Sequence, residues 1–476
     1  MSTSKNSYWL RSGFYTLFER GAVLVFGFGG VIMLFRTLSL AEFGTWAVFL
    51  SIVSILEVGR VGLLSNALVK YLSVAKDADD RRMEGLINTA SFVLNGLITV
   101  LIVLGLLLLA PLVGRVMEQP ILVDMLRIYC VTTILLMPFF QFNFVQQANL
   151  DFRGITYSNI TKQGTLFAFI AVVFFSGRDV SLTELAYVQV LGAVLAAGVS
   201  FSFARRFLVF SKTVSEQWVR KLFRFGKYVC GTNLSTMLYK SIDRLMLGAL
   251  PGVGMGAVGI YDAAIRVTNM TEVPTFSIAS ILFPQSAREA ASGGKTAVRD
   301  LYEKAVGAIL AILVPAIVVV LLFAPQIIDL IAGDDYAEAA PVLRLTILFG
   351  LFIPFIVQFG TVLDSIGKPK VNFGFTLGSM ILNVVLNYVF ITRMGVMGAA
   401  IGTMITYFCT FCGMQWMLHR ELGVKFWRAF TYMIDFYRML PEILRDRFGS
   451  TPTNDTLLDD QLLEPTIEKP ATVEGL

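Results

Sequence analysis

Long apolar stretches alternate with short polar turns along most of the chain. Most of these stretches hold about twenty residues, the length at which an α-helix crosses the hydrocarbon core of a bilayer. Residues 367–403 show the pattern: a basic Gly-Lys-Pro-Lys turn opens one apolar run, and a turn with Gly395 and Gly398 opens the next. In the first run, Asn383 and Asn387 share one helix face. The pattern predicts twelve membrane-spanning helices, at residues 14–37, 43–65, 86–110, 123–146, 157–176, 182–204, 228–250, 257–284, 305–330, 341–365, 371–391 and 398–418.

The composition supports an all-α polytopic membrane protein. Of the 476 residues, 55% are hydrophobic and only 15% are charged, whereas roughly a quarter of the residues of a soluble domain are charged. The four cysteines lie in apolar stretches, where such residues usually pack as small apolar side chains. The single histidine, His419, cannot build a metal site. Gly294-Lys295-Thr296 is not a phosphate-binding loop, because Glu289 stands where that loop needs glycine. We expect no metal, cofactor, nucleic-acid partner or enzymatic activity.

Lysine and arginine are concentrated in alternate connections between the predicted helices. Cytoplasmic loops of membrane proteins carry the excess of these residues, so the rich set is predicted to be cytoplasmic. The opposite set holds only Arg36, Arg115, Arg178 and Arg393, and its loop at 331–341 is acidic. Because the number of spans is even, both termini are predicted to lie in the cytoplasm. The rich set holds Lys70, Lys76, Arg81, Arg82, Arg153, Arg205, Arg206, Lys212, Arg220, Lys221, Arg224, Lys227, Arg288, Lys295, Arg299, Lys304, Lys368 and Lys370.

The two halves of the chain repeat one another at a nearly constant offset. Gly44 matches Gly259 and Glu57 matches Glu272 at an offset of 215 residues, and two further matches lie at 216 and 217. Each half starts on the same side of the membrane, which predicts parallel repeats related by an axis along the membrane normal. The predicted division is a six-helix half at 1–204, a cytoplasmic linker with an amphipathic surface helix at 205–227, a second six-helix half at 228–420, an amphipathic cytoplasmic helix at 421–448 and a disordered acidic tail at 449–476.

Ionisable side chains within the predicted membrane helices are concentrated in the first two helices of each half. They recur at steps of three and four residues, so each series forms one polar stripe. The simplest packing places the four stripes around a water-filled cavity between the halves. Charged groups inside a membrane are costly and therefore mark functional positions. We expect substrate binding at Arg20, Arg60, Lys240, Arg244, Arg266 and Asn269, and ion coupling or counter-charges at Glu19, Glu57, Asp243, Asp262 and Glu272.

Short motifs across residues 8–420 occur in a characteristic order. They are Glu42-Phe43-Gly44 before Trp46-Ala47, Asp243 within SIDRLMLGAL, Gly259-Ile260-Tyr261, Phe283-Pro284-Gln285-Ser286, Gly333-Asp334-Asp335-Tyr336 and the basic turn at 367–370. Together with the segment that follows that turn, these motifs resemble the Wzx-type oligosaccharide and polysaccharide flippases. That family belongs to the superfamily that also holds the multidrug (MATE) exporters and the lipid II flippases.

The resemblance implies a function. The family moves an oligosaccharide on a polyprenyl diphosphate across the bacterial cytoplasmic (inner) membrane by alternating access, for O-antigen or exopolysaccharide synthesis. Basic cavity groups would then bind the diphosphate, since arginine binds phosphate bidentately. In the lipid II flippases an arginine follows an aromatic and small-residue stretch of the eighth helix. Arg266 in YDAAIR matches it, although the proline that follows in that motif is displaced to Pro274. Expected partners are the lipid-linked oligosaccharide, membrane lipid, a polysaccharide polymerase and glycosyltransferases.

Other interpretations stay open at this point. A cation-coupled multidrug exporter shares the same fold, but such proteins favour acidic cavities, and a scaffold for polysaccharide enzymes has no need of buried charges. Arg60 either lines the cavity or extends to the membrane surface. The pairs Glu19–Arg20 and Asp243–Arg244 either serve the substrate or form structural ion pairs between helices. Glu57 and Glu272 are either proton or sodium sites or simple counter-charges.

Overall fold

The structure, a computed structural model, describes residues 2–292 and 294–448. Its described residues form helices joined by short turns, without strands. The N-terminal half contains α1 (Ser2–Thr37), α2 (Leu40–Asp77), α3 (Arg81–Val116), α4 (Pro120–Ala148), α5 (Phe152–Ser176), α6 (Leu182–Ala204) and the 3₁₀ helix η1 (Arg205–Phe207). The C-terminal half contains α7 (Glu216–Ala249), α8 (Gly254–Thr268), η2 (Asn269–Thr271), α9 (Glu272–Ser292), α10 (Gly294–Ala332), η3 (Asp334–Tyr336), α11 (Ala339–Thr346), η4 (Ile347–Leu351), α12 (Ile353–Ser365) and α13 (Pro369–Leu422), and α14 (Phe426–Phe448) follows.

Nine helical segments of the described chain are long and apolar enough to cross a membrane. One of them, the 54-residue α13, bends at Gly395, whose φ of +57° and ψ of −131° only glycine adopts readily, so α13 supplies two spans. The two further segments, α7 and the α8–α9 pair, are less apolar because they carry two of the charged stripes. The predicted fold class is confirmed: an all-α polytopic membrane protein with about twelve spans in two six-helix halves.

Three predicted boundaries differ from the structure. The amphipathic stretch of the predicted linker is not a separate helix, because α7 runs without a break from Glu216 and packs Leu222 into the core formed with α2 and α3. The predicted span 257–284 is interrupted by η2, and the span 341–365 is interrupted by η4. Both interruptions break the helix near mid-segment, which changes the face that the following helix turns to its neighbours.

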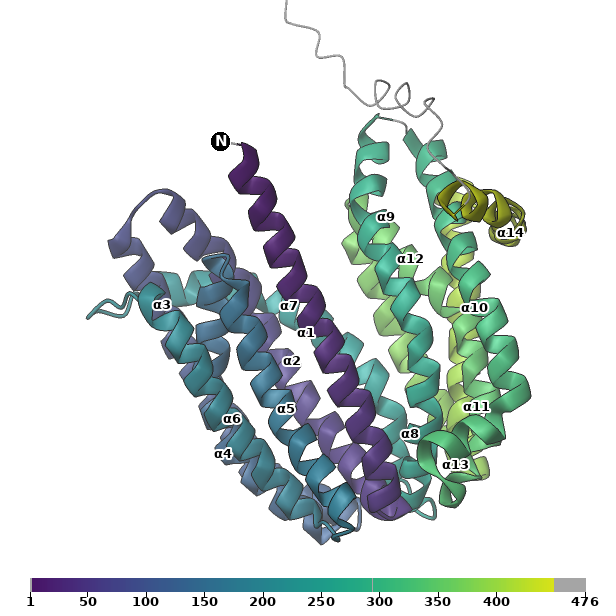
Figure 1. The fold of residues 1–476 in the computed structure, drawn as a ribbon, viewed down its shortest axis with the longest axis horizontal. Helices are drawn as coiled ribbons and strands as arrows, with labels where there is room; N and C mark the ends of the chain where they lie inside the picture. The colour runs from purple at the N-terminus through teal and green to yellow at the C-terminus, as the bar shows by residue number, and fades with distance from the viewer. Residues whose placement is uncertain (1, 293, 449–476) are drawn as a thin grey trace, which may run out of the picture.

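The two halves form two bundles that diverge toward the end bearing the N-terminus and α14, and meet at the other end (Figure 1). Contact between them runs along α2, which packs against α7 over its length and against α8 near its start. A Cβ added at Gly44 would lie 1.8 Å from the carbonyl oxygen of Met255, and one at Gly259 would lie 2.5 Å from that of Leu40. Gly44 and Gly259 are also partners in the sequence repeat. Because Gly44 and Gly259 are repeat partners and lie in contact, the axis predicted to relate the two halves would pass between them.

Aromatic side chains close the end at which the bundles meet. Phe35 of α1 stacks on Phe43 of α2 with ring centroids 4.1 Å apart, and Tyr336 of η3 lies edge-on to Phe35 at 4.9 Å. All three are almost fully buried. Nearby, Arg36 donates a hydrogen bond of 2.9 Å to the carbonyl oxygen of Leu330 in α10. These contacts join α1 and α2 to the C-terminal half, so separation of the halves at this end must break them.

The amphipathic helix predicted after the last span is α14, and it docks on α10. Buried Glu303 accepts a 2.8 Å hydrogen bond from the backbone amide of Lys425 and forms an ion pair with Arg428. Gly307 lets the α14 backbone approach, since a Cβ there would lie 2.7 Å from the carbonyl oxygen of Ala429. Trp427 and other aromatic side chains of α14 are exposed, as suits a helix at a membrane surface. The predicted tail at 449–476 lies outside the described residues.

Candidate functional site

Three of the predicted charged residues form a triad between α7 and α8. Asp262 and Arg266 lie one helical turn apart on α8, and α7 brings Arg244 against the same carboxylate. Asp262 accepts one charge-assisted hydrogen bond from Arg244 on Oδ1 and one of 2.7 Å from Nε of Arg266 on Oδ2. The Asp262 side chain is 1% exposed and that of Arg266 is 27% exposed. The triad carries one net positive charge and offers it on the accessible guanidinium of Arg266.

The bonds described for the Arg266 side chain engage only its Nε atom. Its guanidinium also lies 5.9 Å from the ring centroid of Phe43 in the other half of the molecule, within the range of a cation–π contact. Because Asp262 fixes the guanidinium from one side, the two terminal nitrogens keep their donors for a ligand. Two parallel N–H donors are the arrangement that binds phosphate bidentately.

Asp243 has different surroundings from its neighbour Arg244. Its carboxylate is buried and accepts hydrogen bonds from Tyr261, from Asn387 and, at 3.1 Å, from Thr403. Asn387 in turn takes part in a 3.1 Å hydrogen bond with Asn383. No lysine or arginine forms a direct ion pair with Asp243 among the residues that the structure describes, so its direct polar contacts are hydrogen bonds.

Asn383 and Asn387 form the shared polar face that the sequence predicts, whereas the contact of this face with Asp243 was not predicted. Tyr261 and Thr403 were missed as functional residues altogether. Tyr261 stands in the Gly259-Ile260-Tyr261 motif, which carries no functional assignment, and the sequence signal for Thr403 is its position in an apolar run.

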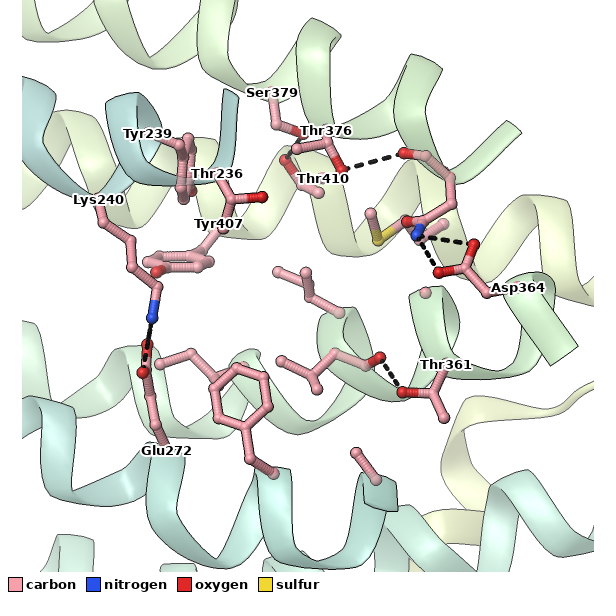
Figure 2. A pocket seen from close by; sticks show the side chains of 18 of the residues that line it. Thr236, Tyr239, Lys240, Glu272, Thr361, Asp364, Thr376, Ser379, Tyr407 and Thr410 are labelled. Atoms are coloured by element: carbon pink, nitrogen blue, oxygen red, sulfur yellow. Dashed lines mark hydrogen bonds and ion pairs between the residues drawn. The ribbon is translucent and has the colours of Figure 1, made fainter. Parts of the chain in front are cut away.

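Lys240 and Glu272 form an ion pair of 2.7 Å between α7 and α9. The pair lies at one end of a cavity of about 430 Å³, and Asp364 with Asn372 lies at the other end (Figure 2). Tyr239, Tyr407 and a set of threonine and serine hydroxyls line it (Figure 2), together with Phe276 and aliphatic side chains. The sequence analysis did not single out Asp364, Asn372 or the tyrosines.

This cavity does not match the predicted one between the halves. The residues that line it come from α7, α9, α12 and α13, and none comes from α1 or α2. The prediction assumed that polar stripes face one another across the symmetry axis. Instead, α2 and α7 pack against each other, and the polar face of α7 is shared between Asp262 of α8 and Glu272 of α9. Asn269 lies exposed in η2 and does not line this cavity.

The predicted residues of the N-terminal half lie apart from the triad. Glu19 accepts hydrogen bonds from Asn159 at 2.6 Å and from Thr156, both on α5, whereas Arg20 is exposed. Glu57 accepts hydrogen bonds from Tyr129 at 2.9 Å and from Thr133 on α4.

Arg60 does not extend to the membrane surface, since it is only 1% exposed and bonds the carbonyl oxygen of Thr133 at 3.1 Å. Burial of its guanidinium against α4 also keeps it away from the cavity of Figure 2.

Comparisons with known proteins agree with this architecture. A family model described as polysaccharide biosynthesis protein matches residues 33–341. The chain is 24% identical over 269 residues to the uncharacterized membrane protein MJ1068 of Methanocaldococcus jannaschii, covering 55% of this chain and 52% of that protein. It is 24% identical over 188 residues to the probable low-salt glycan biosynthesis flippase Agl15 of Haloferax volcanii, covering 40% and 39%. The chain thus spans about half, or less, of the length of these two relatives. The match to the lipopolysaccharide biosynthesis protein WzxC of Escherichia coli K12 is longer, at 21% identity over 440 residues, 89% of this chain and 84% of WzxC.

Two solved structures share the fold. The inward-facing conformation of a multidrug resistance MATE family transporter of the MOP superfamily superposes with a TM-score of 0.73, at 15% identity, covering 84% of this chain and 94% of that one. The lipid II flippase MurJ in an inward closed conformation gives a TM-score of 0.72 at 13% identity, covering 95% and 96%. At such identities the likeness establishes the arrangement of helices and leaves the cargo open.

Proposed function

Because the chain belongs to the polysaccharide biosynthesis protein family, we propose that it is a flippase that carries a polyprenyl-diphosphate-linked oligosaccharide across the membrane by alternating access. Transport would require no bond-making or bond-breaking step on the chain. The names of Agl15 and WzxC support a role in the assembly of cell-surface glycans. We propose O-antigen or exopolysaccharide as the product, the bacterial cytoplasmic membrane as the location, and a polymerase and glycosyltransferases as partners.

Arg266 carries the proposal. Its guanidinium is partly exposed and oriented by Asp262, whose other carboxylate oxygen pairs with Arg244. A diphosphate that leaves water must recover its lost hydrogen bonds from protein donors, and charge-assisted bonds to arginine are among the strongest available. Asp262 neutralises only one of the two guanidinium groups, so an anion still gains from the remaining charge.

We further propose that Asp243 couples transport to a proton or cation gradient. A buried carboxylate without a cationic partner is costly, and the gain of a proton or a cation would relieve that cost. Asp243 and Arg244 are neighbours in α7, so a change in the charge of Asp243 acts on the helix that contributes Arg244 to the triad.

Substitution of Arg266 tests the proposed phosphate contact. In a flippase-deficient strain that this chain complements, Arg266→Gln should lower polysaccharide export about tenfold or more, because one charge-assisted contact contributes about 1.5–3 kcal/mol. Arg266→Lys should restore export only partly, since an ammonium group lacks the planar fork. Arg178→Gln, at an exposed arginine in the turn before α6, is the matched control. Expression and thermal stability are measured for each variant.

Full export by a well-expressed Arg266→Gln variant would show that Arg266 does not bind the substrate. Failure of the unmodified chain to restore export in any such strain would count against the flippase itself. A multidrug exporter of the same fold would instead protect cells against cationic drugs, and the carboxylate of Asp364 in the cavity of Figure 2 is the group such drugs would seek.

A further inference from the structure

Residues that line the cavity of the C-terminal half have counterparts in the N-terminal half. Subtracting the repeat offset of 215 to 217 from three of them gives three residues of the N-terminal half. Glu272 corresponds to Glu57, Ile356 to Phe140 and Ser379 to Lys162. The acidic residue is kept, but a hydroxyl is replaced by the cation of Lys162, and a second cation, Arg60, lies three residues after Glu57 where the C-terminal half has Thr275. The two halves therefore offer different chemistry at equivalent positions.

These N-terminal residues form one cluster in space. The ammonium group of Lys162 on α5 lies 5.5 Å from the ring centroid of Phe139 and 5.6 Å from that of Phe140. The guanidinium of Arg60 on α2 lies 5.8 Å from the same Phe140 ring. Glu57 lies one turn before Arg60 on α2 and close enough to Lys162 to interact with it electrostatically. The cluster thus gathers side chains from α2, α4 and α5 around a single aromatic ring.

The cluster holds more positive than negative charge. Neither Arg60 nor Lys162 forms an ion pair with any residue in the described part of the chain. Glu57 turns one carboxylate oxygen to Tyr129 and Thr133, and its other oxygen and Nε of Arg60 have no hydrogen-bond partner there. Arg60 is almost fully buried, whereas Lys162 keeps part of its surface exposed. An excess charge away from water is unfavourable unless a counter-ion reaches it, and Lys162 is the cation that one could reach.

We propose that the Glu57–Arg60–Lys162 cluster is a second anion-binding site, with Lys162 as the residue that contacts a phosphate group of a polyprenyl diphosphate. The inference rests on the proposed function and extends it, because it gives the substrate's diphosphate a position in the N-terminal half in addition to Arg266. The equivalent C-terminal cavity carries Lys240 against two carboxylates, Glu272 and Asp364, so it does not favour an anion.

Binding to the purified full-length protein tests the site, with farnesyl diphosphate as the probe and isothermal titration calorimetry as the readout. Lys162→Gln should weaken binding about tenfold, the loss of one charge-assisted contact, and Lys162→Arg should largely restore it. Glu57→Gln should strengthen binding, because it removes the only negative charge of the cluster and keeps an acceptor for Tyr129. A residue with a purely structural role would not produce opposite effects at Lys162 and Glu57.

Lys304→Gln, at an exposed lysine of α10, is the matched control and should bind the probe as the unmodified protein does. Farnesol should not compete, since it lacks the phosphates. Equal affinity of Lys162→Gln and the unmodified protein, with each variant folded as judged by its thermal transition, would overturn the inference. In that case the flippase proposal still stands if the unmodified chain restores export. Binding of the probe without restored export would instead support the site and count against the flippase.

Discussion

At the residue scale, adjacent charges in one helix have separate partners. Asp243 and Arg244 follow each other in α7, yet Arg244 pairs with Asp262 of α8 while Asp243 bonds Asn387 and Thr403 of α13. Neighbouring residues of a helix point about 100° apart, so they reach different partners, although Tyr261 of α8 also bonds Asp243. Asp243 is therefore free to change its charge without a direct exchange of partner by Arg244.

Asp243→Asn tests this separation. The amide keeps the size of the carboxylate but turns a donor toward groups that already donate, so we expect a loss of about 1–3 kcal/mol in stability and loss of gradient-driven export. Thermal unfolding of the purified protein and export in the complemented strain are the two measurements. Asp335→Asn, at an exposed residue of η3, is the control. Export that remains at the unmodified level would assign Asp243 a purely structural role.

At the element scale, glycines decide how closely the two halves approach. Gly44 of α2 contacts the backbone of α8, and Gly226 of α7 lies where a Cβ would be 1.8 Å from the carbonyl oxygen of Leu63. At these glycines the helix backbones touch directly, with no side chains interdigitated between them, as is common between membrane helices. They also make α2 the element through which the halves hold together in this conformation.

Gly44→Ala should weaken the closed end of the molecule. The new methyl group meets backbone rather than a movable side chain, so the helices must separate, at a cost of about 1–3 kcal/mol. A lower thermal transition and greater labelling of a cysteine placed at Phe35 are expected. Gly105→Ala is the matched control, because a Cβ at that position of α3 meets nothing within 4 Å. An unchanged transition in both variants would show that the α2–α8 contact does not limit stability.

At the scale of the whole molecule, α2 ends and α5 begins at the divergent end of Figure 1, and these helix ends carry Lys76 and Arg153. The acidic η3 turn joins α10 to α11 at the opposite ends of the helices. If the positive connections lie in the cytoplasm, the bundles diverge toward the cytoplasm and the aromatic cluster at Phe35 seals the outer face. The triad would then be reached from the cytoplasmic side.

Cysteine labelling tests that orientation. In a cysteine-free background, a cysteine at Asp335 should react with an impermeant reagent added outside intact cells. One at Lys295 should react only after the cells are opened. Both positions are exposed, so a lack of reaction reflects the membrane rather than burial. Replacement of the native cysteines is needed because Cys409 and Cys412 are exposed on α13. Labelling of the Lys295 variant from outside would reverse the orientation.

The sequence by itself determined the spans, the repeat and the identity of most charged residues in the membrane. These follow from local properties: the length of an apolar run, the helical step of three and four, and the offset between similar segments. Eleven residues were proposed for the site, and six of them, from Lys240 to Glu272, lie in or beside the triad, the Asp243 cluster and the cavity. The seventh predicted residue of that range, Asn269, is exposed in η2, and the four from the N-terminal half lie elsewhere. Lys162 was missed because it is the single charged residue of the predicted span 157–176 and so forms no stripe.

Only the tertiary structure decided which charges meet. Asp243 lies 144 residues from Asn387 and 160 from Thr403, and no local pattern specifies that pairing. The rotation of each helix about its axis follows from close packing, here from glycines such as Gly44 and Gly259 and from the breaks at η2 and Gly395. These packing contacts place α7 against α2 as well as α8 and put the cavity inside the C-terminal half. They leave Lys162 at the N-terminal position equivalent to Ser379 of the cavity, close to Phe140 and Arg60. A stripe of charges fixes which face of a helix is polar, but the neighbour that this face meets depends on packing contacts far apart in the chain.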